Sequence, residues 1–187
     1  MSRFRLFIII LIFSSLVQAD FLDKRLDEIS ANAEMTADFT DIWRADYLDQ
    51  DIISHGKLYF KRPDLLIKEV ISPESLTYTV SRDSVKVEQG ETVKHIRLSE
   101  HPELGMGIYA LRALLQGDRA ALDRMFLYQF RHSDNNFQSW VLELFPKLTY
   151  SQNKVRKITV SGYKDELRKL EIVYINGDAH ITRIDPE

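Results

Sequence analysis

Residues that could hold a metal ion or catalyse a reaction are present in this chain, but their spacing does not group them. The histidines stand at positions 55, 95, 101, 132 and 180, and no two have the spacing that places two metal ligands on one helix face. The sequence contains no Gly-x-Ser-x-Gly nucleophile motif, no phosphate-binding loop and no dinucleotide-binding glycine pattern. We therefore expect a binding protein that is not an enzyme and that uses no metal and no cofactor.

A pattern suited to binding begins at Gly56. Gly56, Leu58, Phe60 and Arg62 occupy alternate positions, so their side chains would lie on one face of a β-strand. That face passes from a small residue through apolar residues to a permanent cation. A guanidinium beside apolar groups needs hydrogen-bond acceptors, which carboxylates or the carbonyls at a helix C-terminus can supply. The alternative is that Arg62 is simply solvated at the end of its strand.

The N-terminus indicates the compartment. Arg3 and Arg5 precede an apolar run from Leu6 to Phe13, and Val17-Gln18-Ala19 supplies short side chains at a cleavage site. This layout predicts a secretory signal peptide over residues 1–19. A membrane anchor is the alternative. It would need an apolar run of roughly 20 residues, and the run in this chain ends near Val17, short of that length.

Composition narrows the class further. The chain has no cysteine, so we expect no disulfide and no lipid anchor of its own. Its net charge is −3, and loss of Arg3 and Arg5 with the signal peptide makes it more acidic. A mildly acidic chain without a basic stretch is a poor partner for nucleic acid. We expect a free, soluble protein outside the inner membrane after cleavage, and we expect it to be a monomer.

The spacing of apolar residues predicts a single α+β domain over residues 20–187. Leu22, Leu26 and Ile29 form one stripe of an opening helix, over residues 20–34. Alternation then predicts strands separated by short turns. The predicted strands cover residues 35–43, 55–62, 65–71, 76–80, 85–87, 93–98, 127–131, 137–145, 155–162, 167–175 and 179–184.

A helical insert interrupts the strands. Ile108, Leu111, Leu114 and Leu115 have helical spacing, and Gly117 would end that helix. A second short helix would follow an Asp118 N-cap. Two hairpin turns are predicted, at Gln89-Gly90 and at Asn176-Gly177, the latter as a type I′ turn.

Several of these residues carry a resemblance to a known family. Phe39, Gly56-Lys57-Leu58-Tyr59-Phe60 and Lys61-Arg62-Pro63-Asp64-Leu65-Leu66 resemble the opening of the periplasmic lipoprotein carriers of the LolA family. That family runs helix, strand, hairpin, G-x-L-x-(V/F)-K-R-P-x-L-F, then further strands with an inserted helical lid. This chain keeps the same order over nearly all of residues 20–187.

The resemblance implies a fold and a function. The fold would be an incomplete antiparallel β-barrel, or half-barrel, with an N-terminal helix and a helical lid over an apolar cavity. The function would be to bind the acyl chains of a lipoprotein or another exported lipid. The carrier would receive this cargo from an inner-membrane exporter and deliver it to an outer-membrane acceptor. The alternative is a periplasmic lipid-sensing or interaction domain of the same fold.

The resemblance also implies site residues. Arg62 matches the arginine that, in this family, contacts backbone groups of the lid helices and holds the empty carrier closed. The lid would be Gly105–Gln116 with Asp118–Phe126, and Gly105 and Gly107 would act as its hinge. For each cavity residue the alternative is ordinary core packing. The predicted cavity residues are Phe39, Trp43, Leu58, Phe60 and Leu66 on one wall, Trp140, Leu142 and Leu144 on the far wall, and Ile108, Leu111 and Leu115 on the lid.

Two features depart from the family. Leu66 stands where a phenylalanine is usual at the cavity mouth, and the chain stops soon after Ile184-Asp185-Pro186 without the family's added strand and loop. That segment helps to set the direction of cargo transfer. The resemblance is therefore to a divergent LolA-like branch.

Overall fold

One antiparallel sheet of 11 strands dominates the fold. The computed structural model describes residues 21–133, 136–147 and 154–187, so the predicted signal peptide (residues 1–19) lies outside the described residues. A helix over residues 21–30 comes first. The other elements are β1 (Glu34–Arg44), β2 (Ile52–Lys61), β3 (Leu65–Ser72), β4 (Leu76–Ser81), β5 (Ser84–Gln89), β6 (Thr92–Arg97), the 3₁₀ turn η1 (Leu98–Glu100), α2 (Pro102–Gln116), α3 (Arg119–Met125), β7 (Phe126–His132), β8 (Ser139–Pro146), β9 (Val155–Tyr163), β10 (Glu166–Tyr174) and β11 (Ala179–Pro186).

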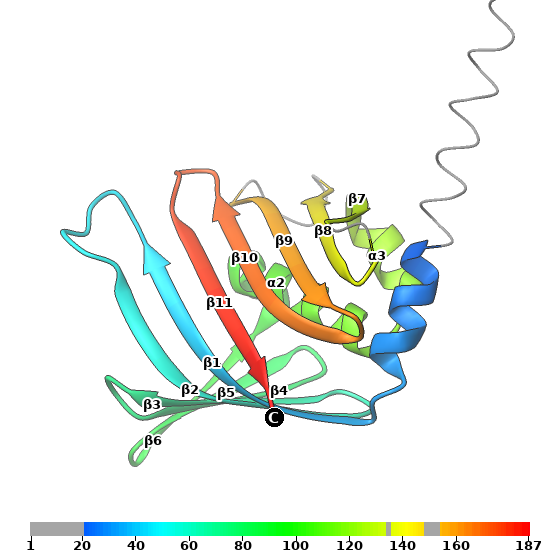
Figure 1. Ribbon diagram of the computed structural model, residues 1–187. Helices are drawn as coiled ribbons and strands as arrows, with labels where there is room; N and C mark the ends of the chain where they lie inside the picture. Colours follow the sequence, from blue (N-terminus) through cyan, green and yellow to red (C-terminus); the bar gives the residue numbers. More distant parts are fainter. Residues whose placement is uncertain (1–20, 134–135, 148–153) are drawn as a thin grey trace, which may run out of the picture.

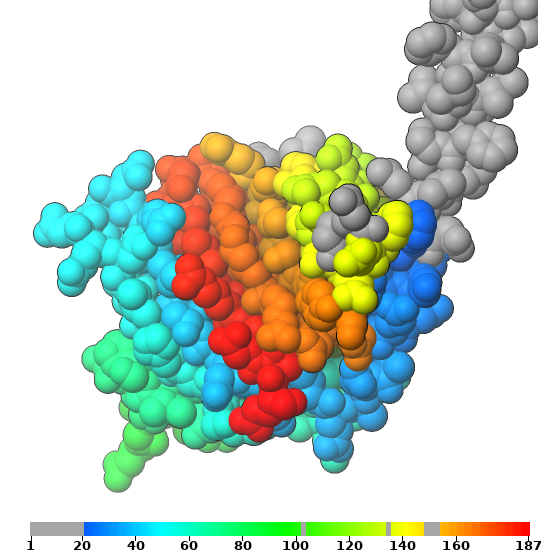
Figure 2. All heavy atoms as spheres, viewed as in Figure 1, coloured from blue at the N-terminus to red at the C-terminus, as the bar shows by residue number. Residues whose placement is uncertain are grey.

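The strand order explains where the helices lie. The order is β6-β5-β4-β3-β2-β1-β11-β10-β9-β8-β7, so the first and last strands pair at the centre, and β6 and β7 are the two edges. Figure 2 shows β11, in red, between β1 and β10. Helices α2 and α3 connect the two edges. They must therefore cross the sheet, and Figure 1 shows α2 on its concave side.

The predicted fold class is confirmed: the structure is α+β, with an antiparallel sheet that stays open and does not close into a barrel. Two turns differ from prediction. Gly90 and Glu91, one residue later than expected, connect Gln89 to its partner Thr92, with Gly90 at φ 56°. In the β10–β11 connection, Gly177 has a positive φ and Asn176 does not.

This second turn is therefore not of type I′, which needs positive φ at both central residues. The amide of Gly177 donates to the carbonyl of Tyr174 (3.2 Å), and the amide of Tyr174 donates to the carbonyl of Asp178 (2.9 Å). The loop is thus a turn without positive φ at Asn176, followed by Gly177 with positive φ. Three-residue loops of this kind are the next commonest connection in β-hairpins.

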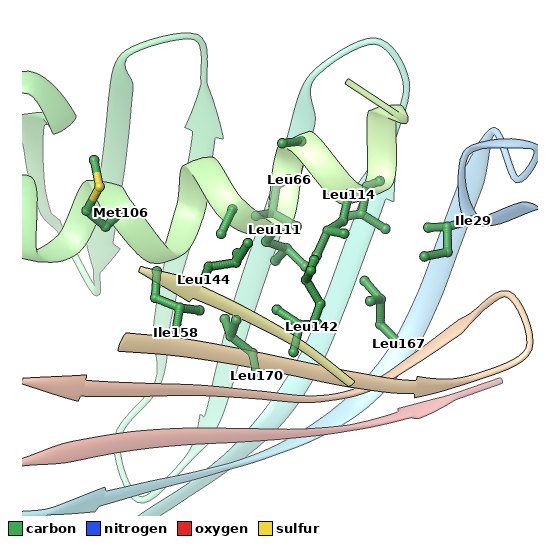
Figure 3. Close-up of a cluster of buried hydrophobic side chains, with 14 of the residues drawn as sticks. Ile29, Leu66, Met106, Leu111, Leu114, Leu142, Leu144, Ile158, Leu167 and Leu170 are labelled. Carbon is green, nitrogen blue, oxygen red and sulfur yellow. The ribbon is translucent and has the colours of Figure 1, made fainter. Parts of the chain in front are cut away.

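Side chains of α2 pack directly against one half of the concave face. Leu111 and Leu114 lie on the side of α2 that faces Leu142, Leu144 and Leu170 of the sheet (Figure 3). Leu114, Leu142 and Leu144 are at most 1% exposed. Burial of a large aliphatic side chain contributes about 1.5–3 kcal/mol, so these contacts hold the insert against β8–β10.

Candidate functional site

A cavity of about 440 Å³ lies between α2 and the other half of the sheet. Its walls come from β1–β5, β10 and β11, and its roof comes from α2. Its inner end is apolar and closed, because Val80, Leu111 and Ile184 are all buried. Its other end reaches solvent at Pro73 and Glu74, which are exposed. The site is therefore a pocket that is lined by buried apolar residues at one end and open to solvent at the other.

Four of the predicted cavity residues meet in this pocket. Leu58 and Leu66 line the sheet side, and Ile108 and Leu111 line the α2 side. Leu58 and Leu66 point inward because β2 and β3 alternate, with Phe60 and Leu66 directly paired across them. Further apolar lining comes from residues that the sequence reading did not single out. These are Val70, Leu76, Tyr78, Val80, Val85, Leu104, Leu170, Ile172 and Ile184.

The other predicted cavity residues are placed in packed regions and are not among the described residues that line the pocket. Phe39, Phe60 and Leu115 are buried in the core cluster. Trp43 is half-buried, with its ring 5.5 Å from the ring of Tyr174 and 5.8 Å from that of His180.

The proposed far wall is solid core. Leu142 and Leu144 are fully buried, and Trp140 lies at the opposite end of the sheet. The indole Nε1 of Trp140 donates to the carbonyl of Lys164 (2.8 Å). A Cβ on Gly162 would lie 2.4 Å from the Trp140 ring, so only glycine leaves room for that indole.

A polar cluster interrupts the apolar lining of the pocket. It consists of Asp41, Lys68, His180 and Thr182, all of which line the cavity. The Thr182 hydroxyl donates to Oδ1 of Asp41 (2.6 Å), and His180 Nε2 lies 3.3 Å from Oδ2. The Lys68 ammonium donates to the same Oδ2 and also lies 4.6 Å from the centre of the Phe39 ring.

The cluster fixes the charge of Asp41. Burial alone would raise the pKa of this carboxyl, but hydrogen bonding to His180 and the charges of Lys68 and His180 outweigh burial and lower the pKa to about 2. Asp41 is thus an anion at neutral pH, and its charge also adds to the effect of burial in raising the pKa of Tyr78. Sequence reasoning missed this cluster, although Asp41 and Lys68 both break an alternating apolar pattern.

Arg62 lies one residue beyond the end of β2, where it contacts two helix ends. Its Nη1 donates to the carbonyl of Ser30 (2.7 Å), and its Nη2 donates to the carbonyl of Gln116 (3.4 Å). Ser30 and Gln116 are the last residues of the N-terminal helix and of α2. The final carbonyls of a helix lack intrahelical partners and carry partial negative charge, so a guanidinium is favourable there. Although exposed, Arg62 therefore ties α2 to the rim of the sheet.

Three side chains of α2 also donate hydrogen bonds from the helix to the turns at the margin of the sheet. Tyr109, Arg112 and Gln116 recur at intervals of three and four residues and so share one face of the helix. Gln116 donates to the carbonyl of Pro63 (2.5 Å), and Arg112 donates to that of Arg82 (2.5 Å). We call Arg62, Tyr109, Arg112 and Gln116 the rim contacts.

The Tyr109 contact is an ionic hydrogen bond. The Tyr109 hydroxyl donates to Oδ1 of Asp83 (2.7 Å) in the turn between β4 and β5. Burial and this bond raise the pKa of Tyr109 to about 12, and bonds from Ser99 and Tyr109 lower the pKa of Asp83. The sequence did contain a signal for these contacts. Tyr109, Arg112 and Gln116 have helical spacing, but the prediction of this helix rests only on its apolar residues.

The proposed hinge glycines lie inside α2, which begins at Pro102. A Cβ on Gly105 would lie 3.1 Å from the carbonyl of Leu98, and one on Gly107 would lie 2.5 Å from Cδ1 of Ile172. Gly107 thus allows α2 to approach β10 closely. A hinge at these glycines stays a prediction.

Two further findings concern the described residues as a whole. None of their helices has the length and apolarity that crossing a membrane requires. Within the same residues, no group of three or more His, Asp or Glu side chains is placed to hold a metal ion.

The fold and the site together define a half-open antiparallel shell with a helix-covered apolar pocket. A family model described as outer membrane lipoprotein carrier protein LolA-like matches residues 14–185. The chain therefore belongs to this LolA-like family. A comparison with curated proteins gives no match.

Solved structures show a distant likeness. A LolA superfamily protein from Nitrosomonas europaea is 12% identical, with 90% of this chain and 91% of that chain covered and a TM-score of 0.45. A DUF1329 family protein from Desulfovibrio piger is 10% identical, with coverage of 90% and 91% and a TM-score of 0.49. The lipoprotein LppX of Mycobacterium tuberculosis is 7% identical, with coverage of 89% and 94% and a TM-score of 0.42. At this distance none of them indicates a ligand for this chain.

Proposed function

We propose that this chain is a periplasmic carrier that binds an acyl chain of a lipoprotein or of another exported lipid and moves it from the inner to the outer membrane. The observation that carries the proposal is the largely apolar pocket under α2. Membership of the LolA-like family supports the same function, and the predicted signal peptide supports the compartment.

The size of the pocket suits one chain. A volume of 440 Å³ holds on the order of fifteen groups the size of a water molecule, at roughly 30 Å³ each. Leaving fifteen methylenes in water costs on the order of 12 kcal/mol, at about 0.8 kcal/mol each. A surface patch cannot offset that cost, whereas an enclosed pocket can. Cargo with more than one chain would require α2 to move outward.

The rim contacts give α2 a means of opening and closing. They are polar bonds at the margin of the sheet, each contributing roughly 0.5–1.5 kcal/mol, or 1.5–3 where a charge is involved. Bonds of this strength can favour the closed empty state without preventing cargo from entering. A closed state that competes with cargo also helps its release to the acceptor.

Native mass spectrometry of protein purified from the periplasm tests binding. We expect wild-type protein to carry the mass of an acylated molecule. Ile108→Trp should lose it, because the indole would fill the pocket that Ile108 lines. Leu127→Trp is the matched control, since Leu127 is 64% exposed on β7. Absence of acylated mass from wild type, together with failure to bind an added acyl probe, would contradict the proposal.

Transfer is measured separately with loaded protein and acceptor vesicles. A carrier should release its cargo to vesicles that contain the outer-membrane acceptor. Protein that binds the acyl chain but never releases it would instead be a lipid-sensing or interaction domain.

A further inference from the structure

An ion pair lies inside a pocket that otherwise suits a hydrocarbon chain. The side chains of Lys68 and Asp41 are 22% and 9% exposed, and both line the cavity. Withdrawing two charges from water is costly, and well-packed apolar residues often stabilise a fold equally well. An acyl chain gains nothing from such a pair. The presence of the pair in the lining therefore points to a ligand that also has a polar group, which would bind beside the pair.

The hydrogen bonds within the cluster show which sign of charge it can accept. Asp41 already accepts from Thr182, Lys68 and His180, so its oxygens are largely satisfied. Lys68 has three N–H donors. Within the described residues, Asp41 is the only hydrogen-bond acceptor that the structure gives it. The groups of the cluster that remain available to a ligand are therefore hydrogen-bond donors of Lys68.

Tyr78 adds a second donor. It lies directly opposite Lys68 on β4 and lines the same cavity. Burial and the charge of Asp41 raise its pKa, so the phenol keeps its proton at neutral pH. An ammonium and a phenol on adjacent strands can both donate hydrogen bonds to an anion.

The cluster lies between the apolar inner end of the cavity and its mouth. Along β11 the inward residues run from buried Ile184 through Thr182 to half-buried His180. Along β3, Lys68 follows buried Leu66. A chain that fills the inner end therefore places its head group beside Lys68.

We propose that Lys68 and Tyr78 form a head-group subsite that binds the carboxylate or phosphate of a single-chain anionic amphiphile, which competes with Asp41, the counter-charge of Lys68. This proposal rests on the proposed function, because it requires the acyl chain to occupy the pocket. A charge-assisted hydrogen bond in such a site contributes about tenfold in affinity.

The test compares chains of one length with different head groups, namely hexadecanoic acid, hexadecyl phosphate and methyl hexadecanoate, by displacement of a fluorescent acyl probe at neutral pH. Wild type should bind at least one of the two anions about tenfold more tightly than the ester. The two anions separate a carboxylate from a phosphate as the preferred group.

The variants assign that preference to Lys68. Lys68→Met should lose the preference and keep ester binding. Asp41→Asn should increase the preference for the anions over the ester, because Lys68 then lacks its counter-charge. The Asp41→Asn/Lys68→Met double variant removes both charges, and it covers the case in which an unpaired Asp41 prevents folding. Lys86→Met is the matched control, because Lys86 is 42% exposed and paired with Glu88 on the same sheet.

The outcomes separate this proposal from the carrier function. Equal affinity of wild type for acid, phosphate and ester overturns the subsite while acyl binding stands. A preference that survives in Lys68→Met or in the double variant, or that falls in Asp41→Asn, also overturns it. Failure of all three probes to bind contradicts the proposed function itself.

Discussion

Arg62 donates a hydrogen bond to Gln116, and Gln116 donates one back to the residue next to Arg62. Arg62 donates to the carbonyl of Gln116 (3.4 Å), and the Gln116 side chain donates to the carbonyl of Pro63, next to Arg62 (2.5 Å). The C-terminus of α2 is thus tied to the β2–β3 turn from both sides. Because the turn and the helix end each supply a donor, loss of one bond weakens the tie without abolishing it.

Replacing Arg62 by leucine should make cargo uptake as fast as in wild type or faster, and transfer slower. Loss of a charge-assisted contact of roughly 1.5–3 kcal/mol shifts the equilibrium between closed and open states by on the order of tenfold. Uptake and transfer are measured separately on one preparation, with Arg97→Leu on β6 as the control. Equal losses in both steps, or no loss in either, would refute a latch role.

Arg112→Met should loosen α2 locally. Its guanidinium bonds the carbonyl of Arg82 and lies 3.8 Å from Asp64, and its side chain is 16% exposed. Removing it should speed hydrogen exchange of α2 amides by an amount that corresponds to about 1–3 kcal/mol. Arg124→Met, on the exposed face of α3, serves as the control. Unchanged exchange in α2 would show that Arg112 does not hold the helix.

Gly107→Ala should destabilise the protein by about 1–3 kcal/mol, because the new methyl group would overlap Cδ1 of Ile172 at 2.5 Å. Urea unfolding measures this change. The double variant Gly107→Ala/Ile172→Val lacks that Cδ1 and should regain part of the loss. Additive losses in the double variant would show that the contact is not the cause.

Acid should weaken the fold through Asp41. Its pKa is about 2 in the folded chain against an ordinary 3.8, so the ionised form stabilises the fold. The contribution, about 2 kcal/mol, is complete above roughly pH 5 and is lost as the pH falls through 2. The stability gap between wild type and Asp41→Asn should therefore narrow over that range, with exposed Asp185→Asn as the control. A gap independent of pH contradicts this assignment.

Local patterns were sufficient to predict the elements of this fold. Alternation in residues 35–43 and helical spacing around Leu111 each identify an element, because the inward face of a strand or helix is set by a period of two or of 3.6. The same patterns cannot show which inward residues meet a void. Leu58 and Leu142 have equivalent spacing, yet one lines the pocket and the other lies in solid core, because α2 packs against only one half of the sheet.

The polar parts of the site were harder to predict. Asp41, Lys68 and His180 come from β1, β3 and β11, and the β1–β11, β1–β2 and β2–β3 pairings together bring them close to one another. Arg62 was found through a short local motif. The family resemblance implied backbone acceptors in the lid helices for Arg62, but no residue type reveals the second acceptor, the carbonyl of Ser30 in the N-terminal helix.

The pairing of β1 with β11 has a consequence for how the protein forms. Ala37 pairs with Pro186, so the central seam of the sheet joins residues separated by nearly the whole described chain. Closing so long a loop costs entropy before any contact repays it, which makes folding slow. Until β11 arrives, β1 and β10 each present an unpaired edge. If the chain is exported unfolded, as the proposed function requires, the sheet is complete only after β11 has crossed the membrane, and until then the edges of β1 and β10 are open to pairing with other chains.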